Sequence, residues 1–221
     1  MTKLAENAYR DVNIAFANEL SLVADTVGVD AWEVIRLANR HPRVNILQPG
    51  PGVGGHCIAV DPWFLVHADP EHTPLIRTAR EVNDAKTVHV IARAVELVEA
   101  GPPGAPVAVL GLAFKANIDD FRESPALRVA EALAARYGRR VRVVEPYAPA
   151  LPPSLAAAGA VAADIDGALA ACPTMIVLVD HDVFRSVPLA ERADKRVLDT
   201  RGIWTDQPRT PAGPTPLRLA S

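Results

Sequence analysis

The sequence has only two cysteines, Cys57 and Cys172, and they lie far apart in the chain. Two thiols cannot build the disulfide framework of a small secreted domain, so the sequence favours a reduced, cytoplasmic setting. The first residues lack the apolar core of a signal peptide. No run approaches the roughly 18 apolar residues of a membrane span, so we expect no membrane partner.

A dominant charge of one sign is also absent, because 23 Lys and Arg stand against 26 Asp and Glu, for a net charge of -3. Such a balance offers no field that would attract nucleic acid or anionic lipid. Aromatic residues make up only 5% of the chain, which argues against base stacking, and we expect no nucleic-acid partner. What is present is 49% hydrophobic residues, enough for the core of one large or two small domains.

The first forty residues predict two helices. Apolar residues recur at helical spacing over 3–27, and Gly28 is a typical C-terminal stop. Asp30 and Glu33 have the spacing of a capping box, which predicts a shorter helix over about 31–39.

A third helix is predicted further along the chain. Thr73 and Pro74 are typical of an N-cap and a first helical residue, and an apolar stripe from 76 to 98 continues to Ala100. A stripe of that length exceeds what a small α/β domain covers, and a large exposed apolar patch is usually an interface. We therefore expect a two-fold homodimer through this helical region.

The pattern changes after the Gly/Pro-rich linker at 101–106. A helix opens at Ser124 and Pro125 and runs to about Tyr137, between short apolar segments. Strands are predicted at 107–110, 141–144, 175–179 and 196–198. Strands that alternate with helices predict an α/β fold with a parallel sheet.

These patterns divide the chain into three parts. We predict a helical domain over 1–101, a Rossmann-like sheet domain over 102–206, and a Pro-rich tail over 207–221 that offers little to bury.

Lys3, Asn7 and Arg10 lie three and four residues apart, so their side chains emerge on one face of the first helix. One interpretation is an ordinary solvated face. The other is an anion-binding stripe, because no acid lies on the same line.

A glycine-rich loop precedes Cys57, and residues 50–55 match G-x-G-x-x-G literally. The dinucleotide fingerprint requires a strand before this motif and a helix after it. Here Pro51 interrupts the motif and Pro62 leaves no room for a useful helix, so we reject that reading. The glycines instead let the backbone approach a ligand or the thiol.

The two thiols differ in their surroundings. Cys172 follows a run of aliphatic residues and is expected to be a small buried hydrophobe. Cys57 follows flexible glycines, and Asp61 lies four residues later. One Cys beside His56 lacks a second ligand pair, so we expect no metal site.

Lys115 follows the first predicted strand, in a loop that leads to the next helix. Open α/β sheets bind ligands at this edge. Lys115 contacts either a phosphate or only water.

Three segments resemble the UDP-glucose/GDP-mannose dehydrogenase family: residues 2–20, residues 39–57, and residues 110–115 together with 121–125. They are most similar to those of the UDP-N-acetyl-D-mannosamine 6-dehydrogenases. The resemblance implies a helical central dimerisation domain followed by a Rossmann-like UDP-binding domain. That family begins with an NAD-binding domain, which would precede Lys3, so we expect this chain alone to be inactive.

The resemblance also implies a reaction, the NAD-dependent four-electron oxidation of UDP-N-acetyl-D-mannosamine to UDP-N-acetyl-D-mannosaminuronate. A thiol attacks the aldehyde intermediate, and water cleaves the resulting thioester. Cys57 matches the family nucleophile and Lys3 matches the lysine that supports the oxyanion. Asn7 matches a residue that orients water or the oxyanion, and Asp61 matches a proton-transfer carboxylate.

Further positions match the family's binding residues. Arg122 matches a residue that reaches the NAD cofactor across a boundary. Positions that hold the UDP-sugar are matched by Arg10, His41, Arg43, Gly54, Phe114 and Lys115. Two alternatives stay open: another UDP-sugar 6-dehydrogenase, acting on UDP-glucose or UDP-N-acetylglucosamine, and a noncatalytic nucleotide-sugar-binding or dimerisation module.

Overall fold

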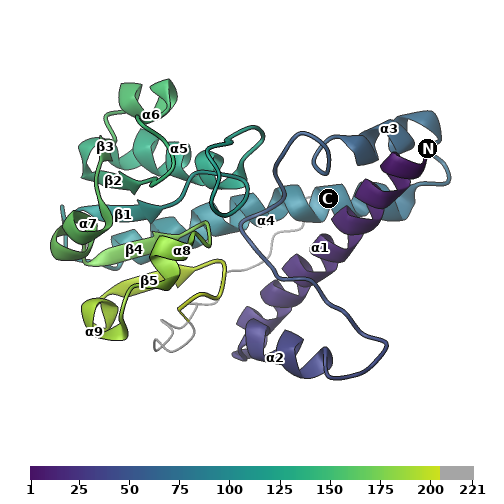
Figure 1. Ribbon diagram of the computed structural model, residues 1–221, viewed down its shortest axis with the longest axis horizontal. Helices are drawn as coiled ribbons and strands as arrows, with labels where there is room; N and C mark the ends of the chain where they lie inside the picture. Colours follow the sequence, from purple (N-terminus) through teal and green to yellow (C-terminus); the bar gives the residue numbers. More distant parts are fainter. Residues whose placement is uncertain (205–221) are drawn as a thin grey trace.

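The computed structural model describes residues 1–204, which form a helical part and a sheet part joined by one long helix (Figure 1). The predicted tail at 207–221 lies outside these residues. None of the helices in residues 1–204 is both long and apolar enough to cross a membrane.

Helices make up the N-terminal part and flank the sheet. They are α1 (Thr2–Val27), α2 (Ala31–Ala38), α3 (Asp61–Ala68), α4 (Pro74–Glu99), α5 (Pro125–Tyr137), the 3₁₀-helix η1 (Gly138–Arg140), α6 (Pro153–Ala157), α7 (Ile165–Ala171), α8 (Asp182–Arg185) and α9 (Leu189–Arg192).

The sequence predicted α1 and α2 and the way each is capped. Gly28 ends α1 with a φ of 76°, in the left-handed region that glycine tolerates, and its N–H donates to the carbonyl of Ala24. Asp30 caps α2 by accepting hydrogen bonds from the N–H groups of Trp32 and Glu33.

The third predicted helix, α4, begins at Pro74, but Thr73 is not its side-chain cap. The Thr73 hydroxyl instead donates to the carbonyl of Asp69 at 2.6 Å, and it accepts no hydrogen bond from the first turn. Only part of the predicted apolar stripe of α4 is exposed. Val98 lies in the core that α4 shares with the sheet and Ile91 and Val95 pack against it, whereas Val88 is exposed. The homodimer through the helical region stays a prediction.

A parallel sheet forms the second part, as predicted. Its strands are β1 (Val107–Leu110), β2 (Val141–Val144), β3 (Val161–Ala162), β4 (Thr174–Val177) and β5 (Arg196–Asp199), in the order β3-β2-β1-β4-β5. All pairs are parallel. The strand predicted at 175–179 ends earlier because the N–H groups of Leu178 and Val179 both donate to the carbonyl of Leu110.

Apolar cores cover both faces of the sheet. Val107 and Val109 of β1 face the core built with α4 and α5, whereas Ala108 and Leu110 face the core built with α7 and Phe184. This alternation along the strand places a helical layer on each side. The helix α4 extends from that sheet to α1 and α3 (Figure 1). The domain boundary at residue 101 stays a prediction.

The expectation that Pro62 prevents a helix is wrong. α3 begins at Asp61, and Pro62 lies in its first turn, where a residue without an N–H is tolerated. No strand precedes the glycines at 50–55, so the motif still lacks the strand–turn–helix arrangement of a dinucleotide site.

A buried polar seam joins α1 to α4. Asp11 accepts from Arg80 at 2.7 Å, and Asn18 donates to Asn83 at 2.9 Å. Because these buried groups require partners, they fix how the two helices lie against each other.

Candidate active site

Cys57 lies in the turn that leads into α3. Its carbonyl accepts hydrogen bonds from the N–H of Val60 at 3.2 Å and from that of Asp61 at 2.8 Å. These bonds hold the thiol next to the N-terminus of the helix. Cys57 itself is half-buried, so its sulfur is accessible to a ligand.

The N-terminal end of α1 supplies two partners to this turn. Asn7 donates to Asp61 Oδ2 at 2.7 Å, and Lys3 Nζ lies 3.5 Å from the same oxygen. Asp61 is buried, with an exposed fraction of 7%, whereas Lys3 reaches it from the surface. The four predicted catalytic residues therefore lie together at the junction of α1 and α3.

The neighbours of Lys3 favour its charged, ammonium form. Attraction to the Asp61 carboxylate, and next a hydrogen bond with the Cys57 thiol, raise the pKa of Lys3 above its ordinary value. A cation that contacts the thiol favours a developing negative charge on sulfur or on an oxygen bound beside it.

The loop between β1 and α5 closes over the glycines that precede Cys57. The Gly55 N–H donates to the carbonyl of Arg122 at 3.1 Å, and Gly54 lies so close that an added Cβ would be 2.9 Å from the Phe114 Cβ. Gly54 is thus needed for a close approach of two backbones. Phe114 is brought to the thiol loop, as its predicted role in binding requires.

Arg122 lies in the same neighbourhood, paired with Asp120. The hydrogen bond to Asp120 is the main cause of a raised pKa of Arg122, and attraction to the Asp120 carboxylate adds to it. The ion pair has an N–O distance of 2.5 Å. The sequence analysis named Arg122 but missed its pairing with Asp120, although the spacing of two residues in a loop permits such a contact.

The sequence analysis also missed three residues that hold the glycine loop. Asn18 accepts from the N–H of Gly50 at 2.9 Å, and the Thr87 hydroxyl donates to the carbonyl of Pro51 at 2.9 Å. An added Cβ on Gly50 would lie 2.5 Å from the guanidinium of Arg201. Nothing in the local sequence of α1, α4 or the end of β5 signals these contacts.

Two other predicted binding residues, Arg10 and Lys115, are exposed. His41 and Arg43 lie in the turns after α2, which Asn39 closes by exchanging two hydrogen bonds with the backbone of Ile46. α2 lies at the end of α1 opposite to α3 (Figure 1), so the turn after α2 begins far from the Lys3 end of α1.

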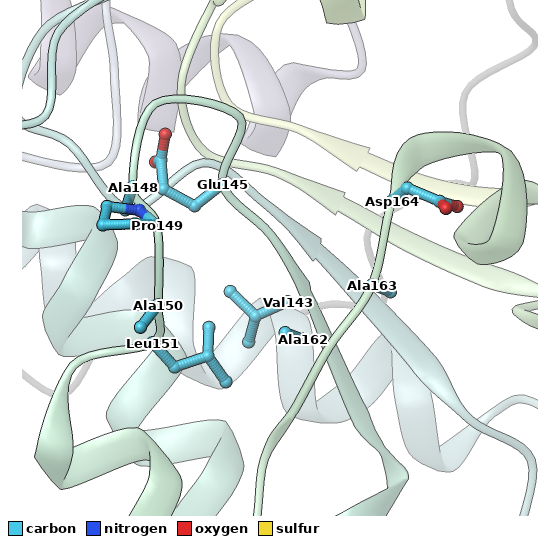
Figure 2. A pocket seen from close by; sticks show the side chains of 9 residues that line it. All are labelled: Val143, Glu145, Ala148, Pro149, Ala150, Leu151, Ala162, Ala163 and Asp164. Carbon is cyan, nitrogen blue, oxygen red and sulfur yellow. The ribbon is translucent and has the colours of Figure 1, made fainter.

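A separate pocket of about 330 Å³ opens at the carboxyl ends of β2 and β3 (Figure 2). Its lining is mostly apolar, and its two acids already have partners. Glu145 accepts from the N–H groups of Leu112 and Tyr147, and Asp164 caps α7. Figure 2 shows no basic side chain in its lining, which does not suit a diphosphate.

Two further expectations concern Cys172 and the grouping of metal-ligating side chains. Cys172 is fully buried, as predicted, and burial raises the pKa of its thiol. Within residues 1–204, no three His, Cys, Asp or Glu side chains gather as a metal site requires.

Comparison with known proteins agrees with this geometry. The sequence model of the UDP-glucose/GDP-mannose dehydrogenase family's central domain matches residues 1–85, and that of its UDP-binding domain matches residues 108–206. The chain therefore belongs to the UDP-glucose/GDP-mannose dehydrogenase family.

Relatives within the family carry two kinds of name. The UDP-N-acetyl-D-mannosamine dehydrogenase of Salmonella typhi is 51% identical over 92% of this chain and 50% of its own length. The NDP-N-acetyl-D-galactosaminuronic acid dehydrogenase of Ralstonia solanacearum is 53% identical over 93% of this chain and 48% of its own. This chain thus spans about half the length of the curated relatives it matches.

A solved structure gives the same result. The UDP-D-ManNAc dehydrogenase of Pyrococcus horikoshii superimposes with a TM-score of 0.80 at 37% identity, covering 94% of this chain and 49% of that protein.

Proposed function

We propose that this chain supplies the thiol and the UDP-sugar site for the NAD-dependent oxidation of UDP-N-acetyl-D-mannosamine to UDP-N-acetyl-D-mannosaminuronate. The observation that carries the proposal is that Lys3 and Asn7 of α1 both reach Asp61, in the turn that Cys57 opens. A thiol, a fixed ammonium and a buried carboxylate are the groups needed to turn an aldehyde into a carboxylate through a thioester.

The chemistry of these side chains follows from their placement. The Cys57 sulfur attacks the carbonyl carbon of the sugar aldehyde, and a negative charge develops on the carbonyl oxygen. The Lys3 ammonium, held by Asp61, stabilises that oxygen. In the later hydrolysis, water attacks the thioester carbon, the carbon–sulfur bond breaks, and Asp61 accepts a proton from the water. Asn7 holds the Asp61 carboxylate in place.

NAD would supply the acceptor for two hydrides, one before and one after the thiol addition. Residues 1–204 do not contain a dinucleotide-binding motif that fits NAD. The glycines at 50–55 follow no strand, and Glu145, the acid at the end of β2, already accepts hydrogen bonds from the protein itself. Arg122 is the residue proposed to reach the cofactor from this chain.

UDP would bind where the β1–α5 loop meets the thiol loop. Phe114 contacts Gly54 and Gly55 there, and Lys115 follows it in an exposed position suited to a diphosphate. Among the described residues, Lys115 has no ion-pair partner to compete with a ligand. The two thiols, neither of which forms a disulfide, also suit a cytoplasmic protein.

A second copy of the chain would pack on α1. Tyr9, Phe16 and Val23 follow one another at a spacing of about two helical turns, and each is more than half exposed, at 71%, 55% and 53%. They form an apolar stripe that nothing in residues 1–204 covers. Antiparallel packing of two α1 helices would place the Lys3 end of one beside the α2 end of the other, and so bring His41 and Arg43 towards Arg10 and the partner's site.

Two measurements test the proposal. The 221-residue chain should bind UDP by calorimetry, and Lys115→Ala should weaken binding by roughly 1.5–3 kcal/mol, as expected for hydrogen bonds to charged groups. A chimera with the N-terminal half of the Salmonella typhi relative should reduce NAD⁺ with UDP-N-acetyl-D-mannosamine, and Cys57→Ser should stall the second half of the oxidation. A preference for UDP-glucose or UDP-N-acetylglucosamine would instead favour another 6-dehydrogenase, and an inactive chimera that binds UDP would favour a noncatalytic module.

A further inference from the structure

The loop that carries Phe114 and Lys115 is fastened at both ends to buried side chains. At its start, the Leu112 N–H donates to Glu145 Oε2 at 2.7 Å. Further along, the Asn117 N–H donates to His181 Nδ1 at 2.9 Å. Lys115 lies between these two bonds, so they limit where its backbone lies.

Asn117 needs such support because its backbone is in the left-handed region, with a φ of 62°. Its side chain is also held, since its Oδ1 accepts from the Tyr147 hydroxyl at 2.9 Å and its Nδ2 donates to Asp182 at 2.8 Å. Asn tolerates this conformation better than most residues, and here four hydrogen bonds fix it in place.

His181 and Glu145 form one buried unit behind the loop. His181 has no exposed surface, and its Nε2 lies 3.4 Å from Glu145 Oε2. Because Nδ1 accepts a hydrogen bond from Asn117, the proton of the neutral ring is on Nε2, which faces the carboxylate. The Tyr147 ring lies against His181, with centroids 4.9 Å apart.

Glu145 is kept ionised in this position. Burial alone would raise its pKa, but the adjacent His181 ring and the hydrogen bonds from the N–H groups of Leu112 and Tyr147 lower it below the ordinary value. In Rossmann folds that bind dinucleotides, an acid at this part of the sheet contacts a ribose. Here the carboxylate is occupied by the protein's own donors.

We infer that Glu145 and His181 are positioning residues, which hold the 111–117 loop in the shape that presents Lys115 to the diphosphate of the ligand. This inference rests on the proposed binding of UDP through Lys115. Neither residue needs to contact the ligand itself, because each acts through the backbone of Leu112 or Asn117.

The test compares UDP with uridine, which lacks the phosphates that Lys115 would contact. His181→Leu removes the hydrogen bond that Nδ1 accepts from Asn117 and the contact of Nε2 with Glu145, and it should weaken UDP binding about tenfold, with uridine binding unchanged. His181→Gln offers an acceptor to Asn117 and a donor to Glu145, so it should restore most of the UDP affinity. Tyr147→Phe, a milder change at a 40% exposed side chain, should lower UDP affinity about threefold without unfolding the protein.

Two further variants separate the possible failures. Asp164 caps α7 and lines the pocket of Figure 2 without touching the loop. The variant Asp164→Ala should therefore lower stability but leave UDP affinity unchanged. If Lys115→Ala weakens UDP binding but His181→Leu and Tyr147→Phe do not, the inference is wrong while the proposed function stands. If Lys115→Ala itself has no effect, the assignment of Lys115 fails, and the inference fails with it. An equal loss of UDP and uridine affinity in His181→Leu would also overturn the inference.

Discussion

Asn7 of α1 donates a hydrogen bond of 2.7 Å to the carboxylate of Asp61, the first residue of α3, across 54 positions of sequence. The same carboxylate lies 3.5 Å from Lys3 Nζ. One buried acid thereby sets the position of two side chains on the opposing helix, and it places the ammonium beside the thiol.

The first prediction concerns the charge on Lys3. Asp61→Asn removes the strongest cause of the raised pKa of Lys3, so that pKa should fall. NMR titration of the lysine side chain would measure the change. Asp69→Asn, which neutralises an exposed acid at the other end of α3, should leave the Lys3 pKa unchanged. Equal values in wild type and Asp61→Asn would contradict the assigned pairing.

The second prediction concerns the two thiols. Cys57 is half-buried beside Lys3, whereas Cys172 is fully buried and burial raises the pKa of its thiol. Iodoacetamide should therefore modify Cys57 at least about tenfold faster than Cys172 in the folded protein. Mass spectrometry of timed samples would measure both rates.

Bound UDP-sugar should protect Cys57, and Lys3→Met should slow its modification by removing the neighbouring cation. Cys172→Ala is the matched control and should leave the Cys57 rate unchanged. Equal labelling of the two thiols would remove the case for an activated nucleophile.

The third prediction concerns assembly. Phe16→Asp places a charge in the exposed apolar stripe of α1 and should convert a dimer into a monomer, because an unpaired charge in an apolar interface is costly. Light scattering would measure the mass. Leu189→Asp, at a similarly exposed apolar residue on α9, should not change it. If the wild-type protein is a monomer at high concentration, the predicted dimer through the α1 stripe is wrong.

The fourth prediction concerns alkaline pH. Burial lowers the pKa of Lys86 to about 8, although its amine donates to Ser21 Oγ at 2.8 Å. Between about pH 8 and about pH 10.5 the unfolded chain binds more protons at this residue than the folded one does. The free energy of unfolding should therefore rise with pH in that window, by up to ~3 kcal/mol.

Urea denaturation at several pH values would measure this rise. Lys86→Met should be more stable than the wild type near neutral pH and should lack the rise. Lys115→Met, at an exposed lysine, should behave as the wild type does. A parallel dependence in the wild type and Lys86→Met would show that another group is responsible.

The fifth prediction concerns acidic pH. Burial is the main cause that lowers the pKa of His89 to about 4, and its Nε2 has no hydrogen-bond partner among the described residues. The unfolded chain binds a proton here at higher pH than the folded chain does, so stability should fall as the pH drops from about 6.5 to about 4. His89→Gln should show a smaller fall, whereas exposed His72→Gln should match the wild type. Thermal denaturation over this pH range would distinguish them.

The sequence by itself determined the elements that depend on local chemistry. Gly28, Asp30 and the Ser124–Pro125 pair mark helix ends because their capping groups act within a few residues of chain. Short apolar runs likewise marked four of the five strands of the parallel sheet, whereas the two-residue β3 is too short to show a pattern. The thiol loop was recognisable because its glycines, Cys57 and Asp61 are contiguous.

Only the tertiary structure decided which distant side chains meet. Periodicity shows that α4 has an apolar face but not what covers it, and here the sheet domain covers the part around Ile91, Val95 and Val98. Asn7 meets Asp61, and His181 meets Glu145, through the packing of separate elements. Such contacts depend on how helices and strands lie in space, which no local pattern encodes.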